Sequence, residues 1–174
     1  MNLDRKRPPG PFETLPSVPS FEVTSSDIFD GAVTHTRHVH HSAGGENLSP
    51  QLSWSGFPAG TKSFAITVFD PDAPTQSGWW HWQVVNIPVS VTSLERGAEL
   101  PEGAIEFRTD YGVPGYQGAS PPPGDHEHRY YFAVHALGVD SLDLDPGTPA
   151  AIVGFQIMAN SNGRAVIVPT FSVD

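Results

Sequence analysis

Residues 63–82 read SFAITVFDPDAPTQSGWWHW and contain the features that decide the fold of this chain. They begin with an apolar run that is typical of a buried strand. In the loop that follows, two prolines restrict the backbone around Asp70 and Asp72, because each proline ring holds φ near about −65° and also limits the residue before it. His81 and three tryptophans come directly afterwards. We therefore expect a stiff loop whose polar groups form the wall of a pocket.

The same strand-like pattern recurs along the rest of the chain. Short apolar or alternating runs bounded by turn residues are typical of strands, and they cover 21–24, 32–39, 51–54, 63–69, 82–87, 129–137 and 165–171. Helix is scarce: residues 149–160 have apolar positions at helical spacing behind a proline, and 93–96 could form one further turn. We therefore predict a mainly β protein, an antiparallel β-sandwich with few short helices, one of them near the C-terminus.

Composition limits the classes of function. The 174 residues fit one domain, and we interpret residues 1–20, rich in proline and charge, as a leader that precedes a domain at 21–174. A net charge of −10 argues against a nucleic-acid surface and against electrostatic binding to an anionic membrane. The lack of cysteine excludes disulfides, thiolate zinc sites and cysteine nucleophiles. Since no apolar stretch suggests a signal peptide or a transmembrane segment, we expect a soluble, cytoplasmic protein.

Polar groups stand beside aromatic residues in three loops that each adjoin a predicted strand. They are Asp70 and Asp72 in the first loop, His81 in the second, and Pro121, Pro122, His128 and Tyr130 in the third. Loops at one end of a sandwich can converge, so a shared pocket is geometrically plausible.

These residues also have structural interpretations. Asp72, and to a lesser degree Asp70, could brace the turn by accepting hydrogen bonds from backbone N–H groups, and His81 could be an ordinary packed histidine. Arg129 is expected to form an ion pair, for which the aspartates are candidates. The two aspartates with His81 and His128 are also suitable ligands for a metal site, so a hydrolase or metal-dependent enzyme stays an alternative.

A further group of histidines lies at His35, His38, His40 and His41. In a strand, His38 and His40 would share a face and could be two metal ligands. No carboxylate lies nearby at a convincing spacing, and a solvated strand edge explains the run equally well. We therefore predict no metal site there.

A series of motifs follows one another along the chain. They are ENLSPQLSW at 46–54, PAGTKS at 58–63, DPDAP at 70–74, GWWHW at 78–82, DYG at 110–112 with GY at 115–116, and PPPG at 121–124 continuing to HRYYF at 128–132. In this order they resemble the phosphatidylethanolamine-binding proteins, in their bacterial branch called Raf kinase inhibitor-like proteins. The resemblance covers about residues 20–174.

The resemblance implies an antiparallel β-sandwich with a small anion pocket at one end, which accepts phosphate, acetate or a phospholipid headgroup without covalent chemistry or a cofactor. The ligand-binding residues that it implies are Asp70, Asp72, His81, Pro121, Pro122, His128 and Tyr130. Histidines would donate hydrogen bonds to the anion, more strongly once protonated below about pH 6.5. Asp70 would orient a histidine by accepting its second N–H, or accept from a ligand ammonium or protonated phosphate. Residues 124–128 depart from the family, because they place an extra histidine and two acids beside the pocket.

We expect a non-enzymatic protein that binds a small anion and could also modulate a kinase or another partner. The first alternative is the enzyme described above. The second is a kinase or protease inhibitor that acts through its loop surface. Exposed apolar faces of a sandwich could also pair two copies as a homodimer.

Overall fold

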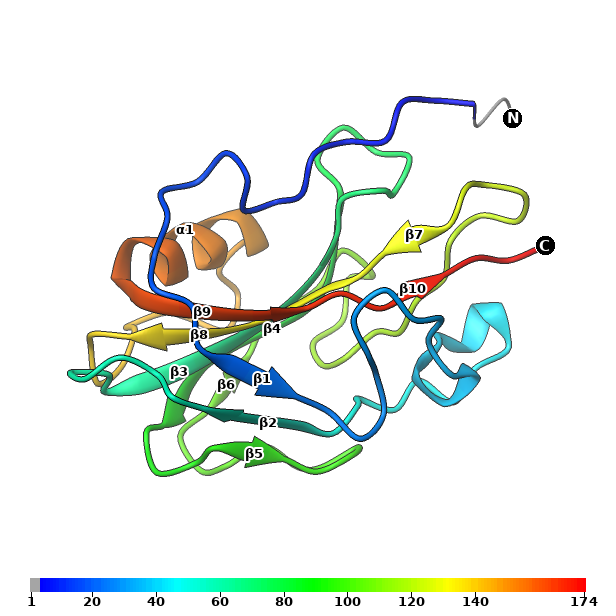
Figure 1. Cartoon of the computed structure of the whole chain (residues 1–174). Helices are drawn as coiled ribbons and strands as arrows, with labels where there is room; N and C mark the ends of the chain where they lie inside the picture. Colours follow the sequence, from blue (N-terminus) through cyan, green and yellow to red (C-terminus); the bar gives the residue numbers. More distant parts are fainter. Residues whose placement is uncertain (1–3) are drawn as a thin grey trace.

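The computed structural model describes residues 4–174, and antiparallel sheets dominate it (Figure 1). The central sheet has five strands in the order β6-β4-β3-β8-β9. Its strands are β3 (Ser63–Asp70), β4 (Trp79–Pro88), β6 (Ile105–Glu106), β8 (Tyr131–Leu137) and β9 (Ser161–Ile167). A second sheet has the order β1-β2-β5, formed by β1 (Glu22–Thr24), β2 (Leu52–Ser55) and β5 (Ser93–Leu94). The antiparallel β-sandwich predicted from the sequence is therefore confirmed.

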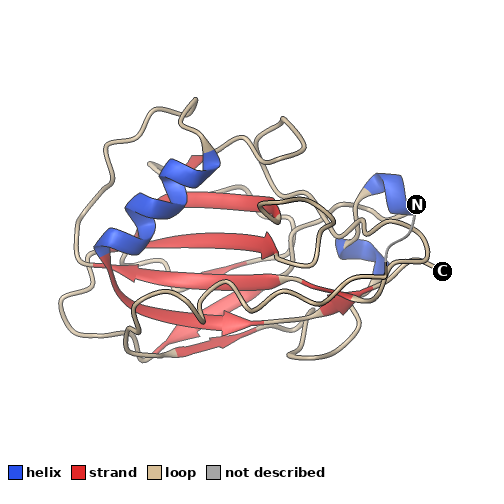
Figure 2. Cartoon of the chain, turned by 90° about the horizontal axis from the view of Figure 1, so that it is seen from above, coloured by secondary structure: helices blue, strands red, loops and turns tan. Residues whose placement is uncertain are grey.

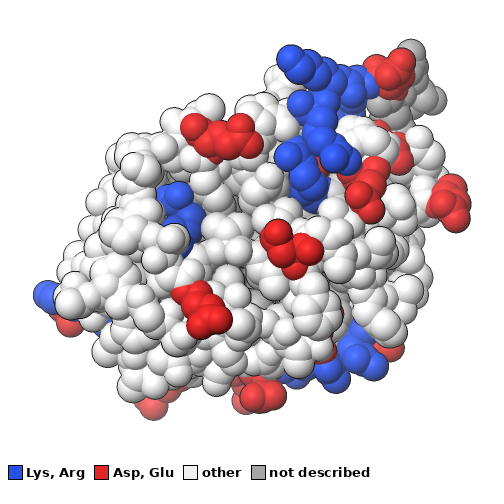
Figure 3. All heavy atoms as spheres, in the orientation of Figure 1, with Lys and Arg blue, Asp and Glu red and all other residues white. Residues whose placement is uncertain are grey.

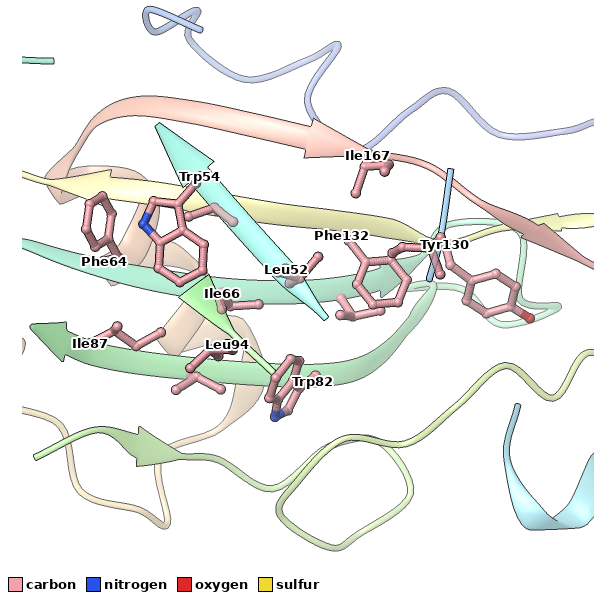
Figure 4. Close-up of a cluster of buried hydrophobic side chains, with 14 of the residues drawn as sticks. Leu52, Trp54, Phe64, Ile66, Trp82, Ile87, Leu94, Tyr130, Phe132 and Ile167 are labelled. Atoms are coloured by element: carbon pink, nitrogen blue, oxygen red, sulfur yellow. The ribbon is translucent and has the colours of Figure 1, made fainter. Parts of the chain in front are cut away.

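The main core lies between these two sheets (Figure 4). Phe64, Ile66 and Val84 of the central sheet pack with Leu52 and Trp54 of β2, and all five are at least 97% buried. Because side chains alternate along a strand, the neighbours of these residues point to the opposite face of the central sheet. That face has its own apolar cluster.

Helix α1 (Ala150–Asn160) covers part of this opposite face (Figure 2). Its buried residues Val153 and Ile157 pack with Ala65 and Leu137 of the sheet. The molecule is thus a sandwich with a third layer made of one helix. No helix within residues 4–174 has the length and apolar character needed to span a membrane.

A two-stranded ribbon extends from the sandwich. It pairs β7 (His128–Arg129) with β10 (Thr170–Phe171). Two 3₁₀ turns, η1 (Thr36–His38) and η2 (His41–Ala43), stand nearby at the same end of the molecule (Figure 1).

Several element predictions need correction. The strand expected at 32–39 is wrong, because η1 occupies its second half, and the helical turn expected at 93–96 begins with strand β5. The strand expected at 129–137 is divided into β7 and β8, and the one expected at 165–171 is divided into β9 and β10. The helix predicted at 149–160 is confirmed within one residue.

The leader prediction covered residues 1–20, of which 1–3 lie outside the described residues. Residues 4–19 form no helix or strand and run across the surface, past α1 and the loop between β3 and β4 (Figure 1). Arg129 Nη2 donates to Pro8 O at 2.8 Å, and Arg164 N donates to Pro19 O at 2.9 Å. The described part of the leader is therefore attached to the domain at Pro8 and at Pro19.

Candidate functional site

A cavity of about 260 Å³ opens between the β3–β4 loop and the start of β7. Polar, aromatic and proline side chains line it: Asp70, Ala73, Pro74, Thr75, Trp79, His81, Tyr111, Ser120, Pro122 and His128. These residues come from the three loops named in the sequence and from the 111–120 segment. The expected convergence of the loops is present.

Asp70 ends β3 and uses both of its carboxylate oxygens within the protein. Oδ1 accepts from the backbone N–H groups of Asp72 and Ala73 at 2.7 and 3.1 Å, and Oδ2 accepts from His128 Nδ1 at 2.8 Å. Asp70, rather than Asp72, is therefore the acid that braces the turn. It also orients His128 by accepting from Nδ1, as expected for a carboxylate that positions a histidine.

His81 lies at an irregularity of β4. In the β3–β4 register, Val68 pairs with Trp82 and Phe69 pairs with Trp80, so His81 is left between two pairs as a bulge residue. A bulge re-aims a side chain, and the His81 ring lines the cavity.

The proton of the His81 ring can be assigned from its partners. Nδ1 lies 2.8 Å from Gln117 O and 3.1 Å from Gly118 O, and since both are carbonyl oxygens, Nδ1 must donate. Burial lowers the pKa of His81, although the charge of Asp70 opposes this shift. The ring is therefore neutral near pH 7 with an unprotonated Nε2, and Nε2 is buried and has no hydrogen-bond partner within residues 4–174.

His128 is held between two acids. Nδ1 contacts Asp70 Oδ2 at 2.8 Å, and Nε2 contacts Asp125 Oδ2 at 3.0 Å. Burial alone would lower the pKa of His128, but the hydrogen bonds and charges of both carboxylates outweigh it and raise the pKa. Burial likewise opposes ionisation of Asp125, yet His128 and Arg5 leave its pKa at about 2. We infer an imidazolium between two carboxylates, in which Asp125 takes the position that a ligand oxygen could take at Nε2.

Asp72 does not line the cavity. It is fully buried beneath Arg129, which donates from Nε to Oδ2 at 2.8 Å and from Nη2 to Oδ1 at 2.9 Å. Arg129 overcomes the effect of burial and lowers the pKa of Asp72. The ion pair expected for Arg129 is confirmed. Both carboxylate oxygens of Asp72 serve this bidentate pair, and the ligand-binding role expected for Asp72 stays a prediction.

The leader adds positive charge next to these acids. Arg5 donates to Asp125 Oδ2 at 2.7 Å and also to Asp72 O, while Arg7 Nη2 donates to Glu127 O at 2.5 Å. Lys and Arg atoms gather beside Asp and Glu atoms where the leader crosses this end of the molecule (Figure 3). Each buried acid at the site therefore has a cationic or imidazolium partner.

Aromatic rings close the cavity. The Tyr111 ring lies 5.5 Å from the Trp79 ring and 5.7 Å from the His81 ring, measured between centroids. Burial raises the pKa of Tyr111 to about 12, so its hydroxyl stays protonated and can donate. Asn47 supports this wall from behind, since its side chain donates to Tyr116 O at 3.2 Å and accepts from Gly118 N at 2.7 Å.

The remaining predicted residues have supporting positions. Pro122 lines the cavity, whereas Pro121 is buried and does not. Tyr130 is 2% exposed and its ring lies edge-on to the His81 ring at 5.2 Å. Of the seven predicted residues, Asp70, His81, Pro122 and His128 are brought together on the cavity wall.

The metal site considered in the sequence analysis would use Asp70, Asp72, His81 and His128 as ligands. These four side chains do not form one ligand set in the structure, because both oxygens of Asp72 are bound by Arg129. Asp125, His126 and His128 instead place ligand atoms within 4.8 Å of one another, but Arg5 already neutralises that carboxylate.

The His35–His41 group is not on a strand. Its imidazoles bond their own loops: His38 Nδ1 contacts Leu48 O at 2.7 Å, and His41 Nδ1 contacts Gly45 O at 2.9 Å. His40 stacks on the Tyr111 ring at 4.5 Å. The shared-face argument for these histidines was therefore wrong, because residues in a 3₁₀ turn do not alternate between two faces.

Sequence reasoning missed four contributors to the site: Trp79, Tyr111, Asp125 and Arg5. Trp79 and Tyr111 belong to the GWWHW and DYG motifs, and Asp125 belongs to the segment 124–128 that departs from the family. The aromatic residues beside the polar loops could have indicated that they line the same site. Arg5 could not have been predicted, because nothing in a charged, proline-rich segment indicates which part of the domain it contacts.

The chain thus combines a β-sandwich with a small polar cavity at one end that aromatic rings close. Residues 24–172 match the phosphatidylethanolamine-binding protein family, and the chain belongs to it.

Two Escherichia coli K12 proteins are similar along most of the chain. The UPF0098 protein YbcL is 48% identical over 162 residues, covering 88% of each protein. The UPF0098 protein YbhB is 46% identical over 158 residues, covering 87% of this chain and 99% of YbhB.

Solved structures of proteins from this family have the same fold as this chain. The crystal structure of E. coli YbcL, described as a new member of the mammalian PEBP family, superimposes with a TM-score of 0.86 at 47% identity and covers 89% of this chain and 99% of that one. A phosphatidylethanolamine-binding protein homologue of Chlamydia trachomatis gives a TM-score of 0.78 at 29% identity, over 89% and 99% of the two chains.

Proposed function

We propose that this protein binds a small anion, phosphate or a phosphorylated headgroup, in the cavity beside Asp70 and His81, and that it does not turn the ligand over. The observation that carries the proposal is the buried, unpartnered Nε2 of His81 at the wall of a cavity of about 260 Å³. A buried polar atom without a partner is rare in folded proteins and points to a missing ligand group or water.

The chemistry of His81 specifies the ligand further. With its proton fixed on Nδ1, the neutral ring offers a lone pair at Nε2, so the bound group must bring a proton or the ring must gain one. The dianion of a phosphate monoester takes up one proton near about pH 6. Both routes consume one proton, and we therefore expect affinity to rise as pH falls from 8 to 6, by up to about tenfold per pH unit.

The hydrogen bonds of Ser120 and His128 support the absence of turnover, because they leave neither residue arranged as a nucleophile with its general base. Ser120 Oγ is hydrogen-bonded to Ser42 Oγ at 2.7 Å rather than to a histidine. His128 has both ring nitrogens bonded to carboxylates, which leaves it no lone pair for a general base. Modulation of a kinase or another partner is a further part of the proposal, and a pull-down with and without bound phosphate would test it.

A titration with phosphate and with phosphoethanolamine tests the binding itself. Imidazole resonances of His81 and His128 should shift saturably, and His81→Gln should weaken binding at least about tenfold, while His41→Gln, in an exposed turn, should leave it unchanged. If His81 stays silent up to millimolar ligand, or if His81→Gln binds as tightly as the unaltered protein, the proposal is wrong.

A further inference from the structure

A second cavity of about 560 Å³ lies on the other side of the central sheet, between that sheet, α1 and the leader. It shares no lining residue with the cavity of His81. Its size is within the range of small-molecule sites, about 300–1,000 Å³.

The walls of this second cavity are mainly apolar. Phe12 and Leu15 of the leader, Phe155 and Met158 of α1, and Trp80 of β4 all line it. Phe155 is 58% exposed at the rim, although it is one of the largest apolar side chains of the helix.

Arg164 of β9 is the unusual member of this lining. It is 9% exposed, and its Nε is buried and makes no hydrogen bond within residues 4–174. None of the ion pairs between described residues involves its guanidinium, which is instead placed over the Phe12 ring at 4.1 Å from the centroid. Burial lowers the pKa of Arg164, and no carboxylate raises it again.

An aromatic face compensates a buried cation only partly, whereas buried charges in proteins are normally paired with an opposite charge. The unpaired edge of Arg164 is therefore a position at which an anion would be stabilised. A planar guanidinium suits a carboxylate in particular, because two parallel N–H donors match its two oxygens.

His135 stands beside Arg164 in the paired strand, since the two residues are opposite each other in the β8–β9 register. Its Nε2 lies 3.0 Å from Thr67 Oγ1, and its Nδ1 is buried without a partner among residues 4–174. Burial, helped by the charge of Arg164, lowers the pKa of His135 to about 3, so the ring is neutral. If Thr67 donates to Nε2, the ring proton is on Nδ1 and is available to the same anion.

We propose that this cavity binds a small amphiphile with a carboxylate head and an unbranched apolar chain. The carboxylate pairs with Arg164 and accepts from His135, and the chain lies between the leader and α1 against Phe155. This site is separate from the anion pocket and does not depend on the function proposed for it.

Decanoate is a suitable probe, at concentrations below those at which it aggregates, with decanol as the uncharged comparison. We expect saturable binding of one decanoate per chain by calorimetry, with affinity at least about tenfold above that of decanol. Arg164→Met keeps the length of the side chain and removes its charge, and it should lower decanoate affinity at least about tenfold while changing decanol affinity little. Arg108→Met, which removes a charge from an exposed position outside the cavity, should bind decanoate as the unaltered protein does.

Two further measurements keep the proposal open to refutation. If Arg164 is unpaired in the free protein, Arg164→Met should melt at the same or a higher temperature, and decanoate should raise the melting temperature of the unaltered protein but not of this variant. Ala151→Phe, at an exposed position of α1 on the cavity lining, should narrow the cavity and weaken decanoate without touching Arg164. Three results would each overturn the proposal: decanoate binding to Arg164→Met as tightly as to the unaltered protein, the unaltered protein binding decanol as tightly as decanoate, or loss of decanoate binding in His81→Gln.

Discussion

Asp125 accepts a hydrogen bond from the Nε2–H of His128, from which an anionic ligand would otherwise accept. Asp125→Asn should therefore have two opposite effects. It removes a charged partner of both His128 and Arg5, and it should lower the free energy of unfolding by about 1–3 kcal/mol. It also removes one negative charge from the edge of the cavity in which we propose that an anion binds, so we expect phosphate to bind about two- to tenfold more tightly.

The pKa of His128 provides the direct readout for this substitution. In Asp125→Asn, NMR titration should show the pKa of His128 moving down, because one of the two carboxylates that raise it is gone. Asp140→Asn is a matched control: its side chain is 85% exposed and pairs only loosely with Lys62 at 3.4 Å, so both stability and the pKa of His128 should stay unchanged. An unaltered pKa of His128 in Asp125→Asn would contradict the two-carboxylate arrangement.

Individual residues of the site could be predicted where a motif confined them. Asp70 and His128 were proposed as site residues because they match motifs of the family. The sequence predicted that Asp70 could orient a histidine without saying which one, and the structure shows that its partner is His128. Which aspartate of the motif pairs with Arg129 could not be predicted, because Asp72 and Arg129 lie 57 positions apart in the sequence. Arg5 is a similar case at a separation of 120 positions.

At the scale of elements, the loop between β3 and β4 depends on a close approach at Gly78. This glycine has φ +69°, and a Cβ there would lie 2.3 Å from Phe69 Cζ and 2.9 Å from Asp70 O. Gly78→Ala should therefore push Asp70 away from His81 and lower the free energy of unfolding by at least about 2 kcal/mol, which corresponds to roughly 4–8 °C in melting temperature for a chain of this size.

Gly56 offers the matched control for that substitution. It has nearly the same backbone angle, φ +70°, but a Cβ there would have no neighbour within 4 Å. Gly56→Ala should cost only the backbone strain, about 1 kcal/mol, and should leave phosphate binding unchanged. Equal losses in the two variants would show that the contact with Phe69 and Asp70 does not matter.

The success of element prediction followed the strength of the local pattern. Long apolar strands such as 63–69, and the helix at 149–160, were predicted well because burial and period agree over many residues. Residues 32–39 alternate as a strand would, yet the imidazoles of His35 and His40 accept from backbone N–H groups and stabilise 3₁₀ turns. Strand β6 has two residues, Ile105–Glu106, and no pattern that short is distinguishable from a loop.

At the scale of the whole molecule, buried histidines set how stability depends on pH. Burial lowers the pKa of His38, His81 and His135, so each contributes stability that is present above the unfolded pKa of about 6.5 and is lost as pH falls. His128 has the opposite sign: its pKa is raised, so its contribution is complete below about pH 6.5 and is lost as pH rises through its folded pKa. Because three of these four buried histidines have a lowered pKa, we expect their combined contribution to the free energy of unfolding to decrease as pH falls.

His135 isolates this effect most cleanly, because its pKa falls to about 3 in a residue that is 4% exposed. Between about pH 6 and pH 4 the unfolded chain binds one proton at this position that the folded protein does not, which makes the free energy of unfolding fall by up to about 1.4 kcal/mol per pH unit. His135→Gln removes that proton uptake, so its slope of unfolding free energy against pH should be smaller by about this amount, measured by urea denaturation at each pH. His41→Gln, in an exposed turn, should reproduce the slope of the unaltered protein. Parallel slopes for His135→Gln and the unaltered protein would mean that His135 is protonated in the folded state, and that the neutral ring inferred beside Arg164 is wrong.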